Sequence, residues 1–291
     1  MTDTVVVVTG ASRGFGLAVA QSFATGFENA DIVLVGRSLD ALKAAAATPT
    51  IANRDAAAAL CAHTLYLSPD YPSSDILNKM PRKIASYSKV ILVHNAGTLG
   101  TIGRLRDADS VQDSLQVNLI APMQLTDAVL KACYKSCETR VKETVIINVS
   151  SLCALQPFDA MGSYCIGKAA REMYFRNLAL EEVLIEKEEK GVSTQPAVTH
   201  TKHAGTNNSK EFNSRVKVLN YAPGPMATDM QRQLRENLPD SQLRDGFKEM
   251  FEVGNLVEPN DSARVLFKII EDGNYESGCH LDYYDVKDRF V

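Results

Sequence analysis

Short runs of β-branched residues alternate with longer helical patterns along the whole of this 291-residue chain. Because parallel strands need a crossover between them, this alternation is typical of a parallel sheet covered by helices. We expect strands at residues 5–9, 31–36, 64–68, 89–94, 144–149, 215–220 and 279–283, and helices at residues 14–27, 39–47, 73–86, 111–134, 163–189 and 260–271. The pattern predicts an α/β fold: a single doubly wound Rossmann-type domain, residues 1–291, with a seven-stranded, mainly parallel sheet and helices on both faces.

The composition is that of an ordinary globular protein, with 45% hydrophobic and 23% charged residues. A net charge of -4 gives no electrostatic reason to expect a nucleic acid or an anionic membrane as partner. The amino terminus has no basic region, and the apolar run 5–8 is too short for a signal-peptide core or a membrane span. The six cysteines show no paired spacing, so we expect free thiols in a reducing, cytoplasmic location.

One polar segment, residues 188–214, interrupts the alternation. Its composition is typical of a flexible surface insertion. Because it joins a helix to the following strand, it should emerge at the amino edge of the sheet, opposite the carboxyl edge where ligands bind. His200 and His203 lie in it without nearby acids or cysteines, so no metal site is expected.

A glycine-rich turn directly follows the first expected strand and leads into an apolar-periodic helix. Glycine permits a tight turn and lets backbone N–H groups approach a pyrophosphate at the positive end of the helix. The spacing differs from the common G-x-G-x-x-G pattern, so the position between strand and helix carries the argument. The residues predicted to hold a dinucleotide here are Gly10, Ala11, Ser12, Arg13, Gly14, Phe15 and Gly16.

The end of the second expected strand favours NADP(H) over NAD. An NAD-binding protein usually carries an acid there for the ribose 2′-hydroxyl, whereas this chain has Arg37 and Ser38. Arg37 together with Arg13 could hold a 2′-phosphate through charge-assisted contacts. The nearest acid, Asp40, is expected to cap the next helix instead.

Two further strand ends carry candidate cofactor contacts. Asp70 and Tyr71 follow the third expected strand and could reach the adenine. After the fourth strand, Asn95, Ala96 and Gly97 include small residues that would let a cofactor pass close to the sheet. Asn95 could equally be a turn residue that supports the neighbouring strands.

The reaction type is indicated by Ser151, Tyr164 and Lys168. A tyrosine and a lysine four apart on a helix share one face, so the cation can make the phenol a usable proton donor near neutral pH. The pair alone is a short motif that also occurs as a solvated surface contact. Its weight therefore comes from the other motifs around it.

Several motifs occur in the order found in the short-chain dehydrogenase/reductase family, which the chain resembles over nearly its whole length: TGASRGFG, residues 94–97, Asn118, Ser151 and the Tyr164/Lys168 pair. His94 departs from the asparagine more usual in that family. The resemblance implies that Tyr164 donates a proton to a substrate carbonyl as hydride arrives from the nicotinamide, and that Ser151 binds the same oxygen. It implies that Lys168 holds the nicotinamide ribose and lowers the pKa of the phenol.

The resemblance also implies that Asn118 binds a water which relays protons through Lys168, although Asn118 could instead help to kink its helix. A segment after the sixth strand is implied to wrap the nicotinamide; its residues are Met226, Ala227, Thr228, Asp229 and Met230. By itself that segment is typical of a turn and a helix cap.

Three stretches, 148–158, 220–230 and 280–285, are similar to family members that reduce pterins. In those members the aspartate matching Asp282 anchors the pterin ring, and a carboxylate can accept paired hydrogen bonds from its 2-amino and N3 groups. Gly224, Ser151 and Tyr164 complete the implied substrate site. The implied reactions are NADPH-dependent reduction of sepiapterin to dihydrobiopterin and of 6-pyruvoyl-tetrahydropterin to tetrahydrobiopterin. A homodimer built through residues 111–134 and 163–187 is also implied.

Two other functions stay open. A reductase of the same fold acting on small diketones, quinones or steroids would keep Ser151, Tyr164 and Lys168 but would not need Asp282. A non-catalytic NADPH-binding sensor or scaffold is also compatible with a dinucleotide fold, because fold alone does not fix function.

Overall fold

The computed structural model describes residues 3–27, 29–52, 59–62, 73–107, 111–134, 140–191, 215–239 and 241–290. Some predicted features lie outside these residues: the strand at 64–68, Asp70, Tyr71, and the part 192–214 of the polar segment 188–214, with His200 and His203.

Seven strands form one sheet in the order β3-β2-β1-β4-β5-β6-β7, and every neighbouring pair is parallel. The strands are β1 (Thr4–Thr9), β2 (Ala30–Gly36), β3 (Ala59–Ala62), β4 (Lys89–His94), β5 (Glu143–Val149), β6 (Val216–Ala222) and β7 (His280–Asp282). Six of them overlap predicted strands, whereas β3 lies before the predicted 64–68. The α/β class and the parallel sheet are confirmed.

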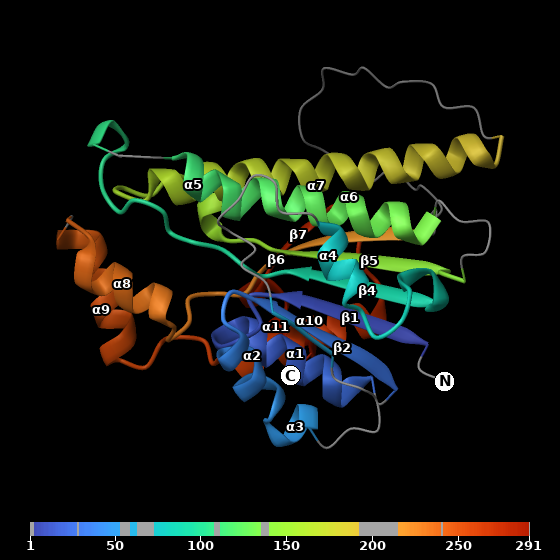
Figure 1. The fold of residues 1–291 in the computed structure, drawn as a ribbon. Helices are drawn as coiled ribbons and strands as arrows, with labels where there is room; N and C mark the ends of the chain where they lie inside the picture. The colour runs from blue at the N-terminus through green and yellow to red at the C-terminus, as the bar shows by residue number, and fades with distance from the viewer. Residues whose placement is uncertain are drawn as a thin grey trace.

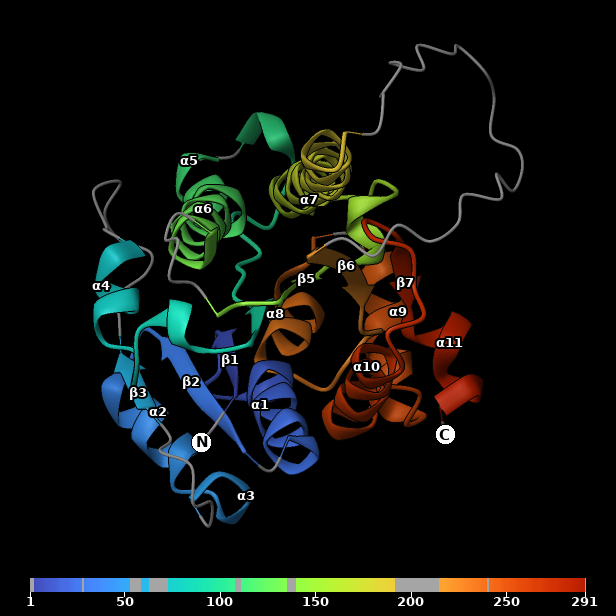
Figure 2. The ribbon, with the colours of Figure 1, turned by 90° about the vertical axis from the view of Figure 1, so that its right-hand side faces the viewer.

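Helices cover both faces of the sheet, with α6 and α7 on one side and α1 and α10 on the other (Figure 2). The helices are α1 (Gly14–Gly26), α2 (Leu39–Ala46), α3 (Pro49–Ala52), α4 (Ser73–Asn78), α5 (Gln112–Leu115), α6 (Ala121–Tyr134), α7 (Gly162–Glu189), α8 (Asp229–Asn237), α9 (Ser241–Glu252), α10 (Pro259–Asp272) and α11 (Tyr283–Phe290). A π-helical turn, η3 (Gln116–Ile120), joins α5 to α6.

The valines of β1 show why the central strands are apolar throughout. Val6 and Val8 pack into the core beneath α1 and α10, while Val5 and Val7 pack into the core beneath α4 and α6. Because successive side chains of a strand point to opposite faces, a strand buried on both faces is apolar at most positions. All four valines are buried.

The helix predicted at 73–86 is two pieces, α4 and a short 3-10 turn, η1 (Ile84–Ser86). Pro81 lies between them, and proline ends a helix before it because its ring clashes with the preceding turn. The helices α3, α8, α9 and α11 were not predicted. Helices α8 and α9 lie beyond the carboxyl ends of the strands, at the left in Figure 1. Among the described residues, no helix has the length and apolar character needed to cross a bilayer.

Candidate active site

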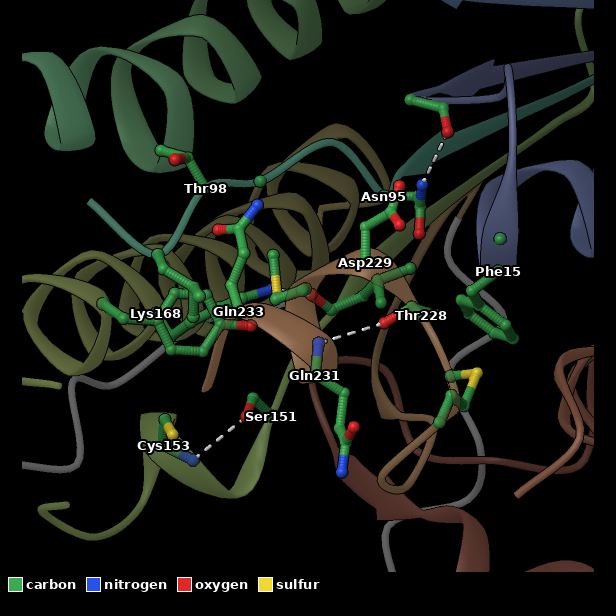
Figure 3. Close-up of a pocket in the computed structure, with 18 of the residues that line it drawn as sticks. Phe15, Asn95, Thr98, Ser151, Cys153, Lys168, Thr228, Asp229, Gln231 and Gln233 are labelled. Atoms are coloured by element: carbon green, nitrogen blue, oxygen red, sulfur yellow. Dashed lines mark hydrogen bonds between the residues drawn. The ribbon is translucent and has the colours of Figure 1, made fainter. Parts of the chain in front are cut away.

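A large cavity lies at the carboxyl edge of the sheet, lined by residues that follow β1, β2, β4, β5, β6 and β7. Its volume is about 1920 Å³, larger than the roughly 300–1,000 Å³ of a pocket for one drug-sized molecule. It has room for a dinucleotide and a second small molecule. Figure 3 shows Ser151, Lys168, Thr228 and Gln231 around this space.

The glycine turn has the geometry that the sequence predicted. Gly10 and Gly14 have positive φ angles of 67° and 56°, which favour glycine. At Gly16 a Cβ would lie 2.3 Å from the carbonyl oxygen of Gly10, so no side chain fits there. Helix α1 begins directly after this turn without a side-chain cap, so its first N–H groups face the cavity edge as an anion site would require.

Two arginines lie beside the turn. Arg13 forms an ion pair of 2.5 Å with Asp229, across the cavity from α1 to the start of α8. Arg37 is exposed at the end of β2 and also lines the cavity. The expectation that Asp40 caps α2 is wrong: Ser38 holds the cap position, where its Oγ accepts a hydrogen bond of 3.3 Å from the backbone N–H of Ala41. Asp40 lies in the first turn of α2.

Asn95 supports the neighbouring strand. Its Nδ2 donates hydrogen bonds to the carbonyl oxygens of Thr9 (3.0 Å) and Gly10 (3.1 Å). The Thr9 Oγ1 in turn accepts from the backbone N–H groups of Asn95 and Ala96. The glycine turn after β1 is therefore held against the end of β4. This fits the turn-and-support alternative considered for Asn95.

His94, the departure from the family pattern, is buried between the sheet and α6. Its Nε2 lies 2.8 Å from the Thr126 Oγ1, and its ring lies 5.2 Å from that of Phe175. Burial, and then the charge of Arg171, lower the pKa of His94 to about 3. The ring is therefore neutral at physiological pH, and its Nε2 is paired with Thr126 at a position where asparagine is more usual.

Asn118 lies on the π-helical turn η3 and is fully buried. Its Oδ1 accepts from the Thr98 N–H at 2.9 Å, and its Nδ2 donates to the Thr98 carbonyl oxygen and to Ser114 Oγ. It thereby ties the helix to the chain that follows β4. Local π-helical turns are frequent at functional sites.

Ser151, Tyr164 and Lys168 all line the cavity. The Ser151 Oγ accepts a hydrogen bond of 3.2 Å from the N–H of Cys153 (Figure 3). Tyr164 and Lys168 lie on α7, with the Lys168 Nζ 5.5 Å from the centre of the tyrosine ring. The Lys168 Nζ donates to the Val149 carbonyl oxygen at 2.6 Å.

The electrostatics of these side chains differ from the expectation in one respect. Burial, followed by Cys153, raises the pKa of the Tyr164 phenol, whereas Arg171 and a hydrogen bond with Ser151 lower it. Burial and the charge of Arg171 lower the pKa of Lys168 well below its ordinary value. The cation that lowers the pKa of the Tyr164 phenol in this arrangement is therefore Arg171.

Arg171 was not predicted from the sequence. It is fully buried, and its guanidinium donates to the carbonyl oxygens of Ala96 (3.0 Å) and Val149 (2.5 Å). It therefore joins the ends of β4 and β5 beneath the cavity. A signal existed, because Arg171 lies seven residues after Tyr164 and three after Lys168, on the same face of α7.

The segment after β6 closes the far side of the cavity. Gly224 has a φ of 80°, and a Cβ there would lie 2.8 Å from Val257. The Thr228 Oγ1 caps α8 by accepting from the Gln231 N–H. Asp282 ends β7 and lines the same cavity, and its Oδ1 accepts from the Tyr284 N–H at 2.9 Å.

Most of the described candidate residues therefore meet in one cavity: Gly10, Ser12, Arg13, Gly14, Phe15, Arg37, Ser38, Asn95, Ala96, Gly97, Ser151, Tyr164, Lys168, Gly224, Met226, Ala227, Thr228, Asp229, Met230 and Asp282. Ala11, Gly16 and Asn118 lie behind this lining rather than in it. The sequence prediction missed five lining residues of α8 and α9, which are Gln231, Gln233, Leu234, Phe247 and Met250. The amphipathic spacing of residues 229–252 was the available signal.

The fold and the site together define a nucleotide-binding oxidoreductase. The sheet is doubly wound and parallel with a glycine turn after β1, and a buried tyrosine lies beside a lysine at the same edge. The chain belongs to the short-chain dehydrogenase family: the family model described as short chain dehydrogenase matches residues 4–212.

Similar proteins agree with this assignment. Sepiapterin reductase from Bos taurus is 34% identical over 97% of this chain and 95% of its own length. Sepiapterin reductase from Rattus norvegicus is 30% identical over 97% of both chains. Benzil reductase from Bacillus cereus is 29% identical over 66% of each chain.

Solved structures show the same fold. A short chain dehydrogenase/reductase from Saccharomyces cerevisiae is 21% identical, with a TM-score of 0.74 over 99% of both chains. A short chain dehydrogenase from Shigella flexneri complexed with NADP is 21% identical, with a TM-score of 0.69 over 98% of both chains.

Proposed function

We propose that this protein reduces side-chain ketones of pterins with NADPH, converting sepiapterin to dihydrobiopterin and 6-pyruvoyl-tetrahydropterin to tetrahydrobiopterin. The observation that carries the proposal is that Asp282 lines the same cavity as Ser151 and Tyr164, more than a hundred residues away in the chain. Relatives named sepiapterin reductase, 30–34% identical over nearly the whole chain, support the substrate class.

The residues of the glycine turn fit an NADP(H) pyrophosphate. Gly10 and Gly14 supply the positive φ angles, and the uncapped start of α1 supplies N–H donors. Arg37 and Arg13 would bind the 2′-phosphate. Arg13 is already paired with Asp229, but with 69% of its side chain exposed that pair contributes only about 0–1 kcal/mol and can be exchanged for a phosphate. When bound, the cofactor supplies the hydride.

The proton comes from Tyr164 in this proposal. Because burial raises the pKa of its phenol, the side chain keeps its proton at neutral pH and can donate it to the carbonyl oxygen of the substrate. Ser151 would donate a hydrogen bond to the same oxygen. Lys168 would contact the nicotinamide ribose, and Arg171 would favour the phenolate left after proton transfer. Asn118 would orient a water that returns the proton.

The pterin ring would be held at the other end of the cavity by Asp282. A carboxylate offers about four lone-pair positions, so the bond from the Tyr284 N–H leaves acceptors for the 2-amino and N3 groups of the ring. Gly224 lies next to this position, since a Cβ on Gly224 would be 3.5 Å from the Tyr284 ring. Its lack of a side chain leaves room for a flat ring.

A homodimer through residues 111–134 and 163–187 is part of the proposal. On α7, Ile166, Met173 and Leu180 are 41%, 55% and 59% exposed. Their spacing of seven residues places them in one stripe, which a second helix would cover. We also propose that the chain acts as one domain, and that it works in the cytoplasm, which fits the free thiols of Cys133, Cys153, Cys165 and Cys279.

A second candidate function is the reduction of small diketones or other carbonyls. The similarity to benzil reductase over two thirds of the chain favours it. This reaction needs Ser151, Tyr164 and Lys168 but gives Asp282 no role. The two functions therefore differ in their dependence on one carboxylate.

Consumption of NADPH with sepiapterin, measured beside the Tyr164→Phe variant, tests the proposed function. The wild-type protein should oxidise NADPH, and the variant should bind NADPH as tightly while turnover falls by at least about 100-fold, the usual contribution of a proton donor. Binding of NADPH without oxidation by sepiapterin, diketones or quinones would favour a sensor or scaffold.

A further inference from the structure

A buried chain of hydrogen bonds joins three elements behind the cavity. The Ser150 Oγ, directly after β5, donates to Glu172 Oε2 at 2.5 Å. The other carboxylate oxygen, Oε1, lies 2.9 Å from Nδ1 of His280, the first residue of β7. Glu172 lies on α7 and is 3% exposed, while the His280 side chain is 12% exposed. The bond between Glu172 and His280 spans 108 residues of sequence.

The contacts of Glu172 define the protonation states along this series of hydrogen bonds. Burial opposes the charge of Glu172, but the hydrogen bonds from His280 and Ser150 prevail and lower its pKa below the ordinary value. A carboxylate has no proton to give, so the His280 Nδ1 carries the hydrogen and donates it. Arg176, one turn further along α7, reaches the same Oε1 at 3.2 Å but is 41% exposed.

Strand β7 is held by β6 along one edge, by the packing of Leu281 on the core and by α11, which follows it directly. It is three residues long and lies at the edge of the sheet, so among the described residues its backbone ladder is with β6 alone. An edge strand can shift or tilt more easily than a strand paired on both sides. The side chain of His280 supplies a link from this edge strand to α7, the helix that carries Tyr164 and Lys168.

His280 and Asp282 lie two residues apart on β7, so both side chains point to the same face of the sheet. Because His280 contacts Glu172, that face is the α7 side. Asp282 lies about 6.6 Å further along the strand, where the cavity begins. The bond between Glu172 and His280 therefore joins the strand that carries Asp282 to the helix that carries Tyr164.

We propose that Glu172 and His280 are positioning residues that set the distance between the proton-donating groups of α7 and the carboxylate of Asp282, and so determine selectivity for a long, two-ended substrate such as a pterin. This inference rests on the proposed function. A small diketone would contact only Tyr164 and Ser151, so the position of the end of β7 should not affect its binding. Selectivity, rather than the reaction itself, depends on the link.

The test compares three variants with sepiapterin and with a small diketone. His280→Ala removes the link to β7 but leaves Ser150 and Glu172 paired. We expect the KM for sepiapterin to rise about tenfold, because a misplacement of about 1 Å can cost up to about 100-fold, while kcat and both constants for the diketone stay within about twofold. His280→Asn places an amide N–H near the position of Nδ1 and should restore the KM for sepiapterin. Arg176→Gln, which removes a contact to Glu172 without touching β7, should leave both substrates unchanged.

Hydrogen–deuterium exchange of the peptide covering residues 278–286 gives a second readout that needs no substrate. His280→Ala should speed exchange there about tenfold and leave the peptides of β4 and β5 unchanged. The inference is overturned by unchanged exchange in this peptide, by equal losses on both substrates, or by a failure of His280→Asn to restore binding. A wild-type protein that reduces the diketone but not sepiapterin contradicts the proposed function instead. In that case the exchange measurement still tests whether the bond between Glu172 and His280 holds β7 in place.

Discussion

Gly16 and Gly246 lie in helices, yet alanine should have opposite effects at the two positions. At Gly16 a Cβ would be 2.3 Å from the Gly10 carbonyl oxygen and 2.4 Å from the Asn95 Nδ2. Contacts below 3.0 Å force a shift, and this one must displace the turn that would hold the pyrophosphate. Overpacking of this kind costs about 1–3 kcal/mol. At Gly246, on α9, a Cβ meets nothing within 4 Å, so alanine should gain about 0.8–1 kcal/mol of helix propensity.

Thermal unfolding with and without NADPH measures both effects. A loss of about 2 kcal/mol should lower the Tm of Gly16→Ala by about 4–8 °C, and its Kd for NADPH should rise at least tenfold because the N–H groups of the turn move. The Tm of Gly246→Ala should rise by a few degrees with the Kd unchanged. Wild-type affinity for NADPH in Gly16→Ala would refute the argument that this turn is the pyrophosphate site.

Three shorter predictions concern other parts of the chain. Arg37→Asp should raise the KM for NADPH at least tenfold and lower the KM for NADH, because it replaces a contact to the 2′-phosphate with a hydrogen bond to the ribose 2′-hydroxyl. Steady-state kinetics with both cofactors measure this, and an unchanged ratio of the two KM values would speak against the 2′-phosphate site. The pKa of His94 is lowered from 6.5 to about 3 in the fold, so below pH 6.5 the unfolded chain takes up a proton that the folded chain does not. The free energy of unfolding should therefore fall by about 1.4 kcal/mol for each pH unit below 6.5. Urea titrations between pH 4.5 and 7 should find that the free energy of unfolding depends less steeply on pH in His94→Asn, and an identical pH dependence would contradict this. Leu180→Lys should convert the proposed dimer to monomers in sedimentation experiments. A wild-type protein that is already monomeric would contradict the proposed dimer.

Strand and helix positions were predictable where burial dictates composition. Strands β1, β4 and β5 are buried on both faces and consist mainly of valine, isoleucine and leucine, which marks them clearly. Strand β3, Ala-Leu-Cys-Ala, has no β-branched residue, so its composition gave no such signal. Helices α8 and α9 follow Pro223, Gly224, Pro225 and Pro239, which are typical of a loop, so their amphipathic spacing was overlooked.

The candidate site was predictable to the extent that its residues belong to local motifs. The glycine turn, the Tyr164/Lys168 pair and Ser151 each lie at a strand end or on one helix face, where short spacings indicate proximity. Arg171 and Glu172 were missed because the groups that hydrogen-bond them inside the protein lie 22 to 108 residues away. A buried charge is recognised only when the groups that surround it are known.

The most direct test of the pterin assignment is the ratio of kcat/KM for sepiapterin to that for a small diketone, measured in wild type and in Asp282→Ala. Loss of two charge-assisted hydrogen bonds to the ring should cost about 3 kcal/mol, which corresponds to a fall of about 100-fold for sepiapterin. The value for the diketone should stay within about threefold, because its reduction uses only Ser151, Tyr164 and Lys168. Equal losses on both substrates, or no loss on either, would contradict a pterin site at Asp282.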